Sequence, residues 1–375
     1  MAALVLVIAV GFAWVTGRAR LFLPYAVPVA VFALAGVMGA VAGPVPGRGL
    51  LAVLQDLLLL AVCGALAITA RKPANASKLL RVWAVSSLCW AAALIVGVAA
   101  GISELSGVTA REGARASLTM GDPNMAANYF MTSIFVLLGS RWPTRRSLRL
   151  IAVVVLLTAM LLTGSNGAVL ALVVGALVTV AVGACLRIHR NPLWGLAAVG
   201  ALVVVIAGAA PLARWQQDVV SYAQGSSIKI VRDSAGRQDQ SSSTRHTLFD
   251  ESLQLLKDEP VFGNGPGSTK TLLETRQYPY AKEAHDDYLA AVTERGAAGI
   301  LGLALLIGAV ASRLRAAARA SVTDHRSVLL SPSLAAGCAV AFAASAMFYE
   351  VLHFRQLWVF LALLAADSIR GRGGS

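Results

Sequence analysis

The sequence predicts an all-α fold, a polytopic bundle of transmembrane helices. Of the 375 residues, 57% are hydrophobic and only 14% are charged, with a mean hydropathy of +0.70. A soluble domain carries about 25% charged residues. The apolar residues also form runs close to the ~20 residues that cross a bilayer, and the Lys and Arg residues gather in short clusters between these runs. These observations argue against a soluble enzyme with one large core.

The apolar runs predict about eleven spans. The run from 149 to 186 resembles one long helix, but Gly164-Ser165-Asn166-Gly167 breaks it into a tight hairpin of two spans. In chain order the predicted spans are 1–16, 21–42, 50–70, 79–101, 122–139, 149–163, 166–186, 193–211, 287–311, 332–348 and 351–369.

The connections between these spans alternate in their content of basic residues. Connections 17–20, 71–78, 140–148, 187–192, 312–327 and 370–375 are rich in Lys and Arg. The other short connections, 43–49, 102–121, 164–167 and 349–350, contain only Arg48, Arg111 and Arg115. Because basic connections remain on the cytoplasmic side, the first set is predicted to be cytoplasmic. Segment 212–286 then lies outside, and the C-terminus lies inside.

The same alternation predicts an external N-terminus, so the alternative is a further upstream helix and twelve spans in the natural protein. The first run lacks a basic n-region, and we expect no cleaved signal peptide. Three regions follow from the topology: helices one to eight in 1–211, an external loop with the functional site in 212–286, and helices nine to eleven in 287–375.

The external loop divides by composition. Residues 224–243 are rich in Ser, Gln and Gly and are predicted to be flexible. Thr244 is a plausible N-cap for an amphipathic helix that Pro260 ends. A turn at 263–267 and a short helix at about 268–276 follow, and the ninth span begins near His285.

Charge and metal-binding patterns exclude other classes of protein. The net charge is +13, but the basic residues form no stripe and no stacking platform, so we expect no nucleic-acid partner. The sequence contains no C-x-x-C and no metal-ligand spacing of His with Asp or Glu. We therefore predict no protein-bound metal and no other cofactor. The apolar spans predict a surface surrounded by membrane lipids.

An external active site needs a substrate that carries its own energy, because cytoplasmic nucleotides do not reach it. An activated lipid with a diphosphate leaving group meets this need. Arg holds phosphate oxygens through its planar fork, and His is the commonest partner of an acceptor hydroxyl. The predicted external face offers Arg214, Arg245 and Arg276 for the diphosphate and His285 for the hydroxyl. The alternatives are an interfacial anchor for each Arg and a helix-end histidine without a role.

Three more residues are candidates for a supporting role: Asp286 beside His285, Asn124 at the start of a span, and Arg355 near the last span. For the segment before Asn124, the alternative is a helix cap by Asp122.

Two polar features stay open or unassigned. The glycines at 263, 265 and 267 present amides to a phosphate or simply form a tight turn. Asp56 lies inside an early span, where acids are costly and often functional. We expect it to lie far from the external loop and assign it no role.

Four motifs in order resemble the O-antigen ligase and polymerase family of bacterial surface-polysaccharide enzymes. They are Asp122-Pro123-Asn124, Thr163-Gly164-Ser165-Asn166-Gly167, Arg245 with Pro260-Val261-Phe262-Gly263-Asn264-Gly265, and His285-Asp286-Asp287-Tyr288-Leu289 with Glu294-Arg295-Gly296-Ala297-Ala298-Gly299. The resemblance covers roughly 120–370. Two positions depart from the family pattern: Asn166 stands where Arg is usual, and Asp286 where Asn is usual.

The resemblance implies a metal-independent, inverting glycosyltransferase of the GT-C type. Its donor would be a glycan on undecaprenyl diphosphate or a similar polyprenyl carrier. By position, Arg245 and Arg214 would hold the diphosphate, and His285 would activate or orient the acceptor hydroxyl. The acceptor is a glycan, a lipid or a protein, so ligase, polymerase and protein-glycosylating activities stay open. The alternative from another class is a polysaccharide or lipid transporter, or flippase.

Overall fold

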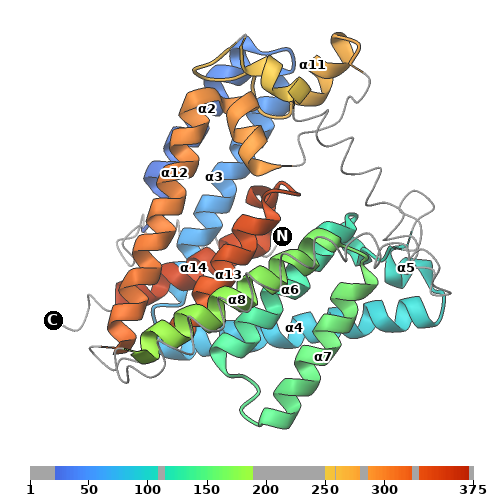
Figure 1. Cartoon of the computed structure of the whole chain (residues 1–375), viewed down its shortest axis with the longest axis vertical. Coiled ribbons are helices and arrows are strands. Elements are labelled where there is room, and N and C mark those ends of the chain that lie inside the picture. Colours follow the sequence, from blue (N-terminus) through green and yellow to red (C-terminus); the bar gives the residue numbers. More distant parts are fainter. Residues whose placement is uncertain are drawn as a thin grey trace, which may run out of the picture. The chain divides into compact units, whose positions relative to one another are not determined.

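The protein is helical throughout the part that the computed structural model describes. That part comprises residues 22–108, 115–188, 250–257, 259–278, 286–322 and 329–370. Within these ranges there are α-helices and short 3-10 turns but no β-strand, as Figure 1 shows. The predicted all-α class is confirmed.

The chain divides into two compact units. Unit 1 comprises Met1–Ser77, Ser243–Ala317 and Ala346–Ser375, and unit 2 comprises Lys78–Ser242 and Ala318–Ser345. The helices assigned mainly to unit 1 are α2 (Ala26–Ala42), α3 (Pro46–Thr69), α11 (Thr269–Thr275), α12 (Asp287–Val322) and α14 (Arg355–Arg370). Those assigned mainly to unit 2 are α4 (Pro73–Ala99), α5 (Ser103–Ser106), α6 (Pro123–Ser140), α7 (Arg146–Leu162), α8 (Asn166–Ile188) and α13 (Pro332–Ser345). The predicted division of the chain into three consecutive regions stays a prediction.

Four of the described helices are long and apolar enough to cross a membrane. They are Pro46–Thr69, Pro73–Ala99, Asn166–Arg187 and Asp287–Ser321, and Ala26–Ala42 and Pro332–Ser345 are shorter apolar helices. All coincide with predicted apolar runs. The predicted runs 1–16 and 193–211 lie outside the described residues, so the count of eleven spans stays a prediction.

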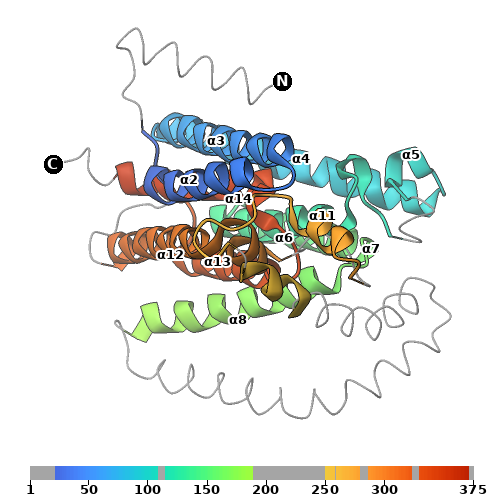
Figure 2. The same ribbon diagram turned by 90° about the horizontal axis from the view of Figure 1, so that it is seen from above.

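In unit 1, α2 and α3 form a helical hairpin and lie side by side in Figure 2. Pro46 occupies the first turn of α3, where its missing N–H costs nothing. At the opposite end of this hairpin, the Arg313 guanidinium of α12 donates to the Pro24 carbonyl at 2.9 Å. The hydroxyl of Tyr25 donates to the Leu361 carbonyl of α14 at 3.1 Å. These bonds tie α12 and α14 to the start of α2.

In unit 2, the predicted break at 164–167 is confirmed: α7 ends at Leu162 and α8 begins at Asn166. The two helices do not pack along each other as the predicted tight hairpin would; α7 packs on α6, and α8 packs mainly on α13. Asp122 caps α6, as the alternative interpretation of this segment expects, since its carboxylate accepts the Asn124 amide at 2.7 Å. Helices α8 and α13 approach closely at two glycines: a Cβ on Gly175 would lie 2.6 Å from the Gly337 carbonyl oxygen.

Helix α12 is broken near its start, and the expectation of one continuous span over 287–311 is wrong. Gly296 has φ 60° and ψ −154°, a backbone conformation essentially restricted to glycine. A Cβ on Gly299 would lie 2.2 Å from the Ala291 carbonyl oxygen. Eight residues of straight helix would separate these positions by about 12 Å. The chain therefore turns back on itself, and residues 287–295 form a separate half-helix.

The last predicted span, 351–369, also begins later than expected. Residues Val351–His353 form a 3-10 turn, and α14 begins at Arg355.

The break at Gly296 generates a stability prediction. In Gly296→Ala, the new Cβ would need a strained backbone and would meet the Val261 carbonyl carbon and oxygen at 2.6 Å. Strain of this kind costs about 1–3 kcal/mol before the clash is counted. We expect a clear fall in the apparent melting temperature of the detergent-solubilised protein. The matched control is Gly308→Ala in the same helix, where nothing lies within 4 Å; equal effects of the two changes would contradict the prediction.

Candidate functional site

The loop at residues 260–265 closes the break in α12 through backbone hydrogen bonds. The amides of Asn264 and Gly265 donate to the carbonyls of Thr293 and Glu294 at 3.1 and 2.9 Å. On the other side of the break, the amides of Ala297 and Ala298 donate to the carbonyls of Pro260 and Val261 at 2.9 and 3.1 Å. Since helix ends leave such groups without partners, the loop acts as the cap of both half-helices.

The Glu294 carboxylate joins this loop to α11. It accepts the Gly267 amide at 2.8 Å and the Thr269 hydroxyl at 2.7 Å. Glu294 is buried, with 6% of its surface exposed. The short helix predicted at about 268–276 is confirmed as α11 with Arg276 at its C-cap.

The glycine turn is a structural element and not a phosphate cradle. The Gly263 amide donates to the Glu259 carbonyl at 3.0 Å. The Gly265 and Gly267 amides both donate to Glu294, one to its carbonyl and one to its carboxylate. All three glycine amides therefore have partners inside the protein, and the reading of 263–267 as a tight turn is the correct one.

A groove of about 370 Å³ lies beside this turn. Its wall is formed by the α2–α3 connection at 42–44 and by Gly263, Asn264 and Leu272. Glu259 and Arg276 supply the charged groups, and both side chains are exposed. A groove with one guanidinium and one carboxylate suits a ligand that carries both anionic and hydroxyl groups.

The N-terminal end of the half-helix is held by two neighbouring acids. The Asp286 carboxylate caps it by accepting the amides of Tyr288 and Leu289 at 2.7 and 3.0 Å. The Asp287 amide donates to the Ala346 carbonyl at 2.9 Å, and the Asp287 carboxylate accepts the Leu352 amide at 3.1 Å. Asn and Asp are about equally good caps, which explains why Asp is tolerated at 286 where the resembled family has Asn.

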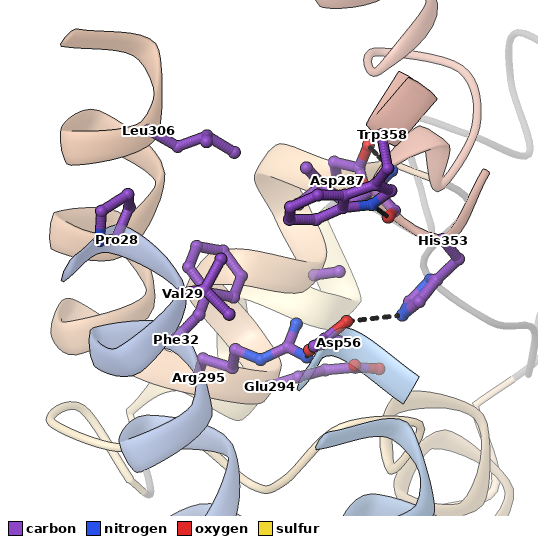
Figure 3. Close-up of a pocket in the computed structure, with 12 residues that line it drawn as sticks. Pro28, Val29, Phe32, Asp56, Asp287, Glu294, Arg295, Leu306, His353 and Trp358 are labelled. Atoms are coloured by element: carbon purple, nitrogen blue, oxygen red, sulfur yellow. Dashed lines mark hydrogen bonds and ion pairs between the residues drawn. The ribbon is translucent and has the colours of Figure 1, made fainter. Parts of the chain in front are cut away.

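A buried ion pair lies against the same half-helix, as Figure 3 shows. The Arg295 guanidinium contacts the Asp56 carboxylate of α3 at 2.6 Å, and both side chains are buried. The His353 Nε2 lies 3.8 Å from Asp56, and its Nδ1 lies 3.5 Å from Glu350. Asp56 is therefore in contact with the helix that follows the predicted external loop. The expectation that it lies far from that loop is wrong.

His353 lies in the 3-10 turn before α14. Burial of the imidazole disfavours its charged form, but the hydrogen bond with Glu350 and the negative charges of Asp56 and Glu350 outweigh this cost. The pKa of His353 is therefore raised above its ordinary value.

In unit 2, Arg115 joins two of the motifs that sequence analysis singled out. Its Nε donates to the carbonyl of Thr163, the C-cap of α7, at 3.0 Å. Its Nη2 donates to Oδ1 of Asn124 at the start of α6. Asn124 thus acts as the partner of an arginine that the sequence analysis did not select.

The structure describes some of the predicted site residues and not others. His285, Arg245 and Arg214 lie outside the described residues, so their roles stay predictions. Arg276 lines the groove, and Asp286 caps the half-helix. Arg355 is exposed at the first residue of α14, and within the described ranges it forms no ion pair with Glu350 or His353.

The residues missed by sequence reasoning are Asp56, Glu294, Arg295 and Arg115. Glu294 and Arg295 belong to a quoted motif, and Asp56 is a rare acid within an apolar run, so each carried a signal. Arg115 is one of only three arginines in the sparsely basic connections. Among the described residues no group of three His, Cys, Asp or Glu side chains is arranged to hold a metal ion; the absence of a cofactor stays a prediction.

Comparison with known families adds an independent finding. A family model described as O-Antigen ligase matches residues 151–307. This range includes most of α7 and all of α8, the glycine turn, α11, the half-helix and the break at Gly296. The resemblance inferred from the motifs is confirmed. No curated protein matches the chain.

The Glu294 carboxylate generates a prediction about local order. Glu294→Ala removes both bonds to 267 and 269, and hydrogen bonds to a charged group contribute about 1.5–3 kcal/mol. We expect amide hydrogen exchange in 264–272 to become roughly tenfold faster or more, with a smaller effect for Glu294→Gln. The control is Glu274→Ala on the exposed face of α11, where the pair with Lys270 spans 3.8 Å. Unchanged protection in Glu294→Ala would contradict this role.

Proposed function

Because the chain carries an O-antigen ligase family domain at residues 151–307, we propose that it transfers an oligosaccharide or polysaccharide from a polyprenyl-diphosphate carrier. The acceptor is a hydroxyl group on the outer face of the cytoplasmic membrane. The protein is an integral membrane protein with several apolar helices, so a lipid-linked donor reaches it by diffusion within the bilayer.

One observation carries the proposal: the glycine turn, α11 and the half-helix form a single hydrogen-bonded joint. Arg276, the C-cap of α11, lines the groove beside this joint, and the half-helix that begins at Asp287 ends in it. His285 directly precedes the Asp286 cap in sequence. A hydrogen-bonded joint that fixes the half-helix following His285 in sequence supports a site in which donor and acceptor meet at fixed positions.

In the proposed reaction, Arg245, Arg214 and Arg276 hold the donor diphosphate and neutralise the charge that develops on it. His285 accepts the proton of the acceptor hydroxyl. The hydroxyl oxygen forms a bond to the anomeric carbon, and the bond between that carbon and the phosphate oxygen breaks. The anomeric centre inverts, and polyprenyl diphosphate leaves. No metal is needed in this scheme.

The acceptor decides the biological outcome. A lipid acceptor makes the protein a ligase, as in lipopolysaccharide assembly. A growing lipid-linked glycan makes it a polymerase, and a protein hydroxyl makes it a protein O-oligosaccharyltransferase. The chemistry at the anomeric carbon is the same in all three.

A transporter or flippase is the second candidate, because two observations favour it. Transporters use broken helices and paired charges within the membrane, and this chain has a break at Gly296 and a buried pair of Asp56 and Arg295. In transporters, however, the free ends of the half-helices face the substrate. Here the amides of Ala297 and Ala298 already donate to Pro260 and Val261, which favours the enzyme.

Reconstituted protein supplied with polyprenyl-diphosphate glycan and acceptors will test the proposal. We expect His285→Ala and Arg245→Ala to lower transfer by about 10²-fold or more, the usual scale for losing a proton acceptor or an electrostatic stabiliser. The product to be measured is the glycosylated acceptor together with released polyprenyl diphosphate.

Lys257→Ala is the matched control, an exposed cation that donates to Gln254 three residues earlier, and should keep full activity. Full product from both site variants would refute the proposed site. Movement of intact lipid-linked glycan across the vesicle, without release of diphosphate, would favour the transporter.

A separate prediction concerns metal dependence. Arginine side chains take the place of a metal in the scheme, so we expect unchanged turnover in the presence of EDTA. Loss of activity on chelation that is restored by adding a divalent cation would overturn the metal-free mechanism.

A further inference from the structure

The half-helix 287–295 is held at its far end by the most buried ion pair among the described residues. The Arg295 side chain has 4% of its surface exposed and contacts Asp56 at 2.6 Å. The two residues are 239 positions apart in the sequence. The pair thus links an early helix, α3, to the element that directly follows His285.

Arg295 also packs against α2. Its guanidinium carbon lies 4.7 Å from the centroid of the Phe32 ring, within the range of a cation–π contact. A Cβ on Gly36 would lie 3.5 Å from Arg295 Nε and 2.7 Å from the Val53 side chain, so glycine leaves the room that the guanidinium occupies. Arg295 is therefore wedged between α2 and α3.

The pair lines a small cavity together with groups from the opposite side. The cavity measures about 30 Å³, and its walls include Asp287, Leu306, His353 and Trp358. About one probe sphere of space is enough for an ordered water, but not for a sugar. This cavity is therefore not a substrate site.

The pair is also poorly suited to provide stability alone. Arg295 Nε is buried and has no hydrogen-bond partner among the described residues. Buried donors without partners are rare and costly, and apolar residues often replace buried ion pairs without loss of stability. A buried ion pair with an unused donor fits a role in fixing the orientation of the half-helix better than a role in stabilising the fold.

We propose that Asp56 is a positioning residue for the transfer reaction: through Arg295 it fixes the half-helix, and hence the position of His285 relative to the donor. The inference rests on the proposed function. Asp56 does not touch the substrate in this scheme. Its effect reaches the reaction through the orientation of the half-helix, which Asp287 fixes at the other end.

The test uses the full chain in nanodiscs and compares Asp56→Asn with the wild type. Misplacement of a reacting group by about 1 Å costs on the order of 10²-fold in rate. We expect kcat to fall at least about tenfold, with the KM for the lipid-linked donor changed less than about twofold, because donor contacts remain. Asp56→Glu, which keeps the charge, should recover most of the lost kcat.

Asp56→Leu combined with Arg295→Met separates positioning from folding. The apolar pair should preserve the fold, as judged by monodispersity and melting temperature, while kcat stays low and amide exchange in 286–295 rises. A well-folded double variant with wild-type kcat would overturn the proposal. So would Asp56→Asn that lost kcat without any change in exchange over 286–295.

Two controls keep the inference apart from the proposed function. Ser312→Ala, whose exposed hydroxyl only bonds within its own helix, should leave kcat and exchange unchanged. His285→Ala should abolish transfer without loosening 286–295. If His285→Ala keeps full activity, the proposed function fails. Wild-type amide exchange in the Asp56 variants would instead refute the role of the Asp56–Arg295 pair in fixing the half-helix.

Discussion

In unit 1, the packing around the glycine turn depends on how the backbone groups at the break in α12 find hydrogen-bond partners. A helix end leaves its terminal amides and carbonyls without partners, and lipid offers none. In this chain Gly296 turns the backbone, and the loop at 260–265 supplies the missing donors and acceptors on both sides. Without that loop, the amides and carbonyls at the interruption would lose their hydrogen-bond partners. Without the interruption, the backbone groups of the loop would lose theirs.

Several other features follow from this joint. Gly265 lies against the backbone of α2, where a Cβ would meet the Gly39 carbonyl oxygen at 2.8 Å, so the loop can pack closely. Glu294 lies in the last turn of the half-helix. Its carboxylate accepts hydrogen bonds from the Gly267 amide and the Thr269 hydroxyl and so connects the half-helix to α11. The neighbouring Arg295 reaches Asp56 of α3. A single turn of chain therefore joins three helices and a loop.

Sequence patterns predicted much of this protein because their causes are local. Apolar runs of membrane-spanning length predicted each of the described long helices, and Gly164–Gly167 predicted the break between α7 and α8. The order of four short motifs indicated the family. Asp122 as a cap and Arg276 at the end of α11 also follow from residue types and spacing within a single turn of helix.

What the sequence alone determined is thus the helical membrane class, the approximate places of the described long helices and the resemblance to the family whose model matches residues 151–307. The tertiary structure decided which residues meet. Hydropathy treats 287–311 as one apolar segment, because the fold-back at Gly296 arises only when the loop bonds to it. No local pattern pairs Asp56 with Arg295, or Arg115 with Asn124 and Thr163. Those pairs form because charged groups removed from water need a partner, and which partner lies within reach is settled only once the helices pack.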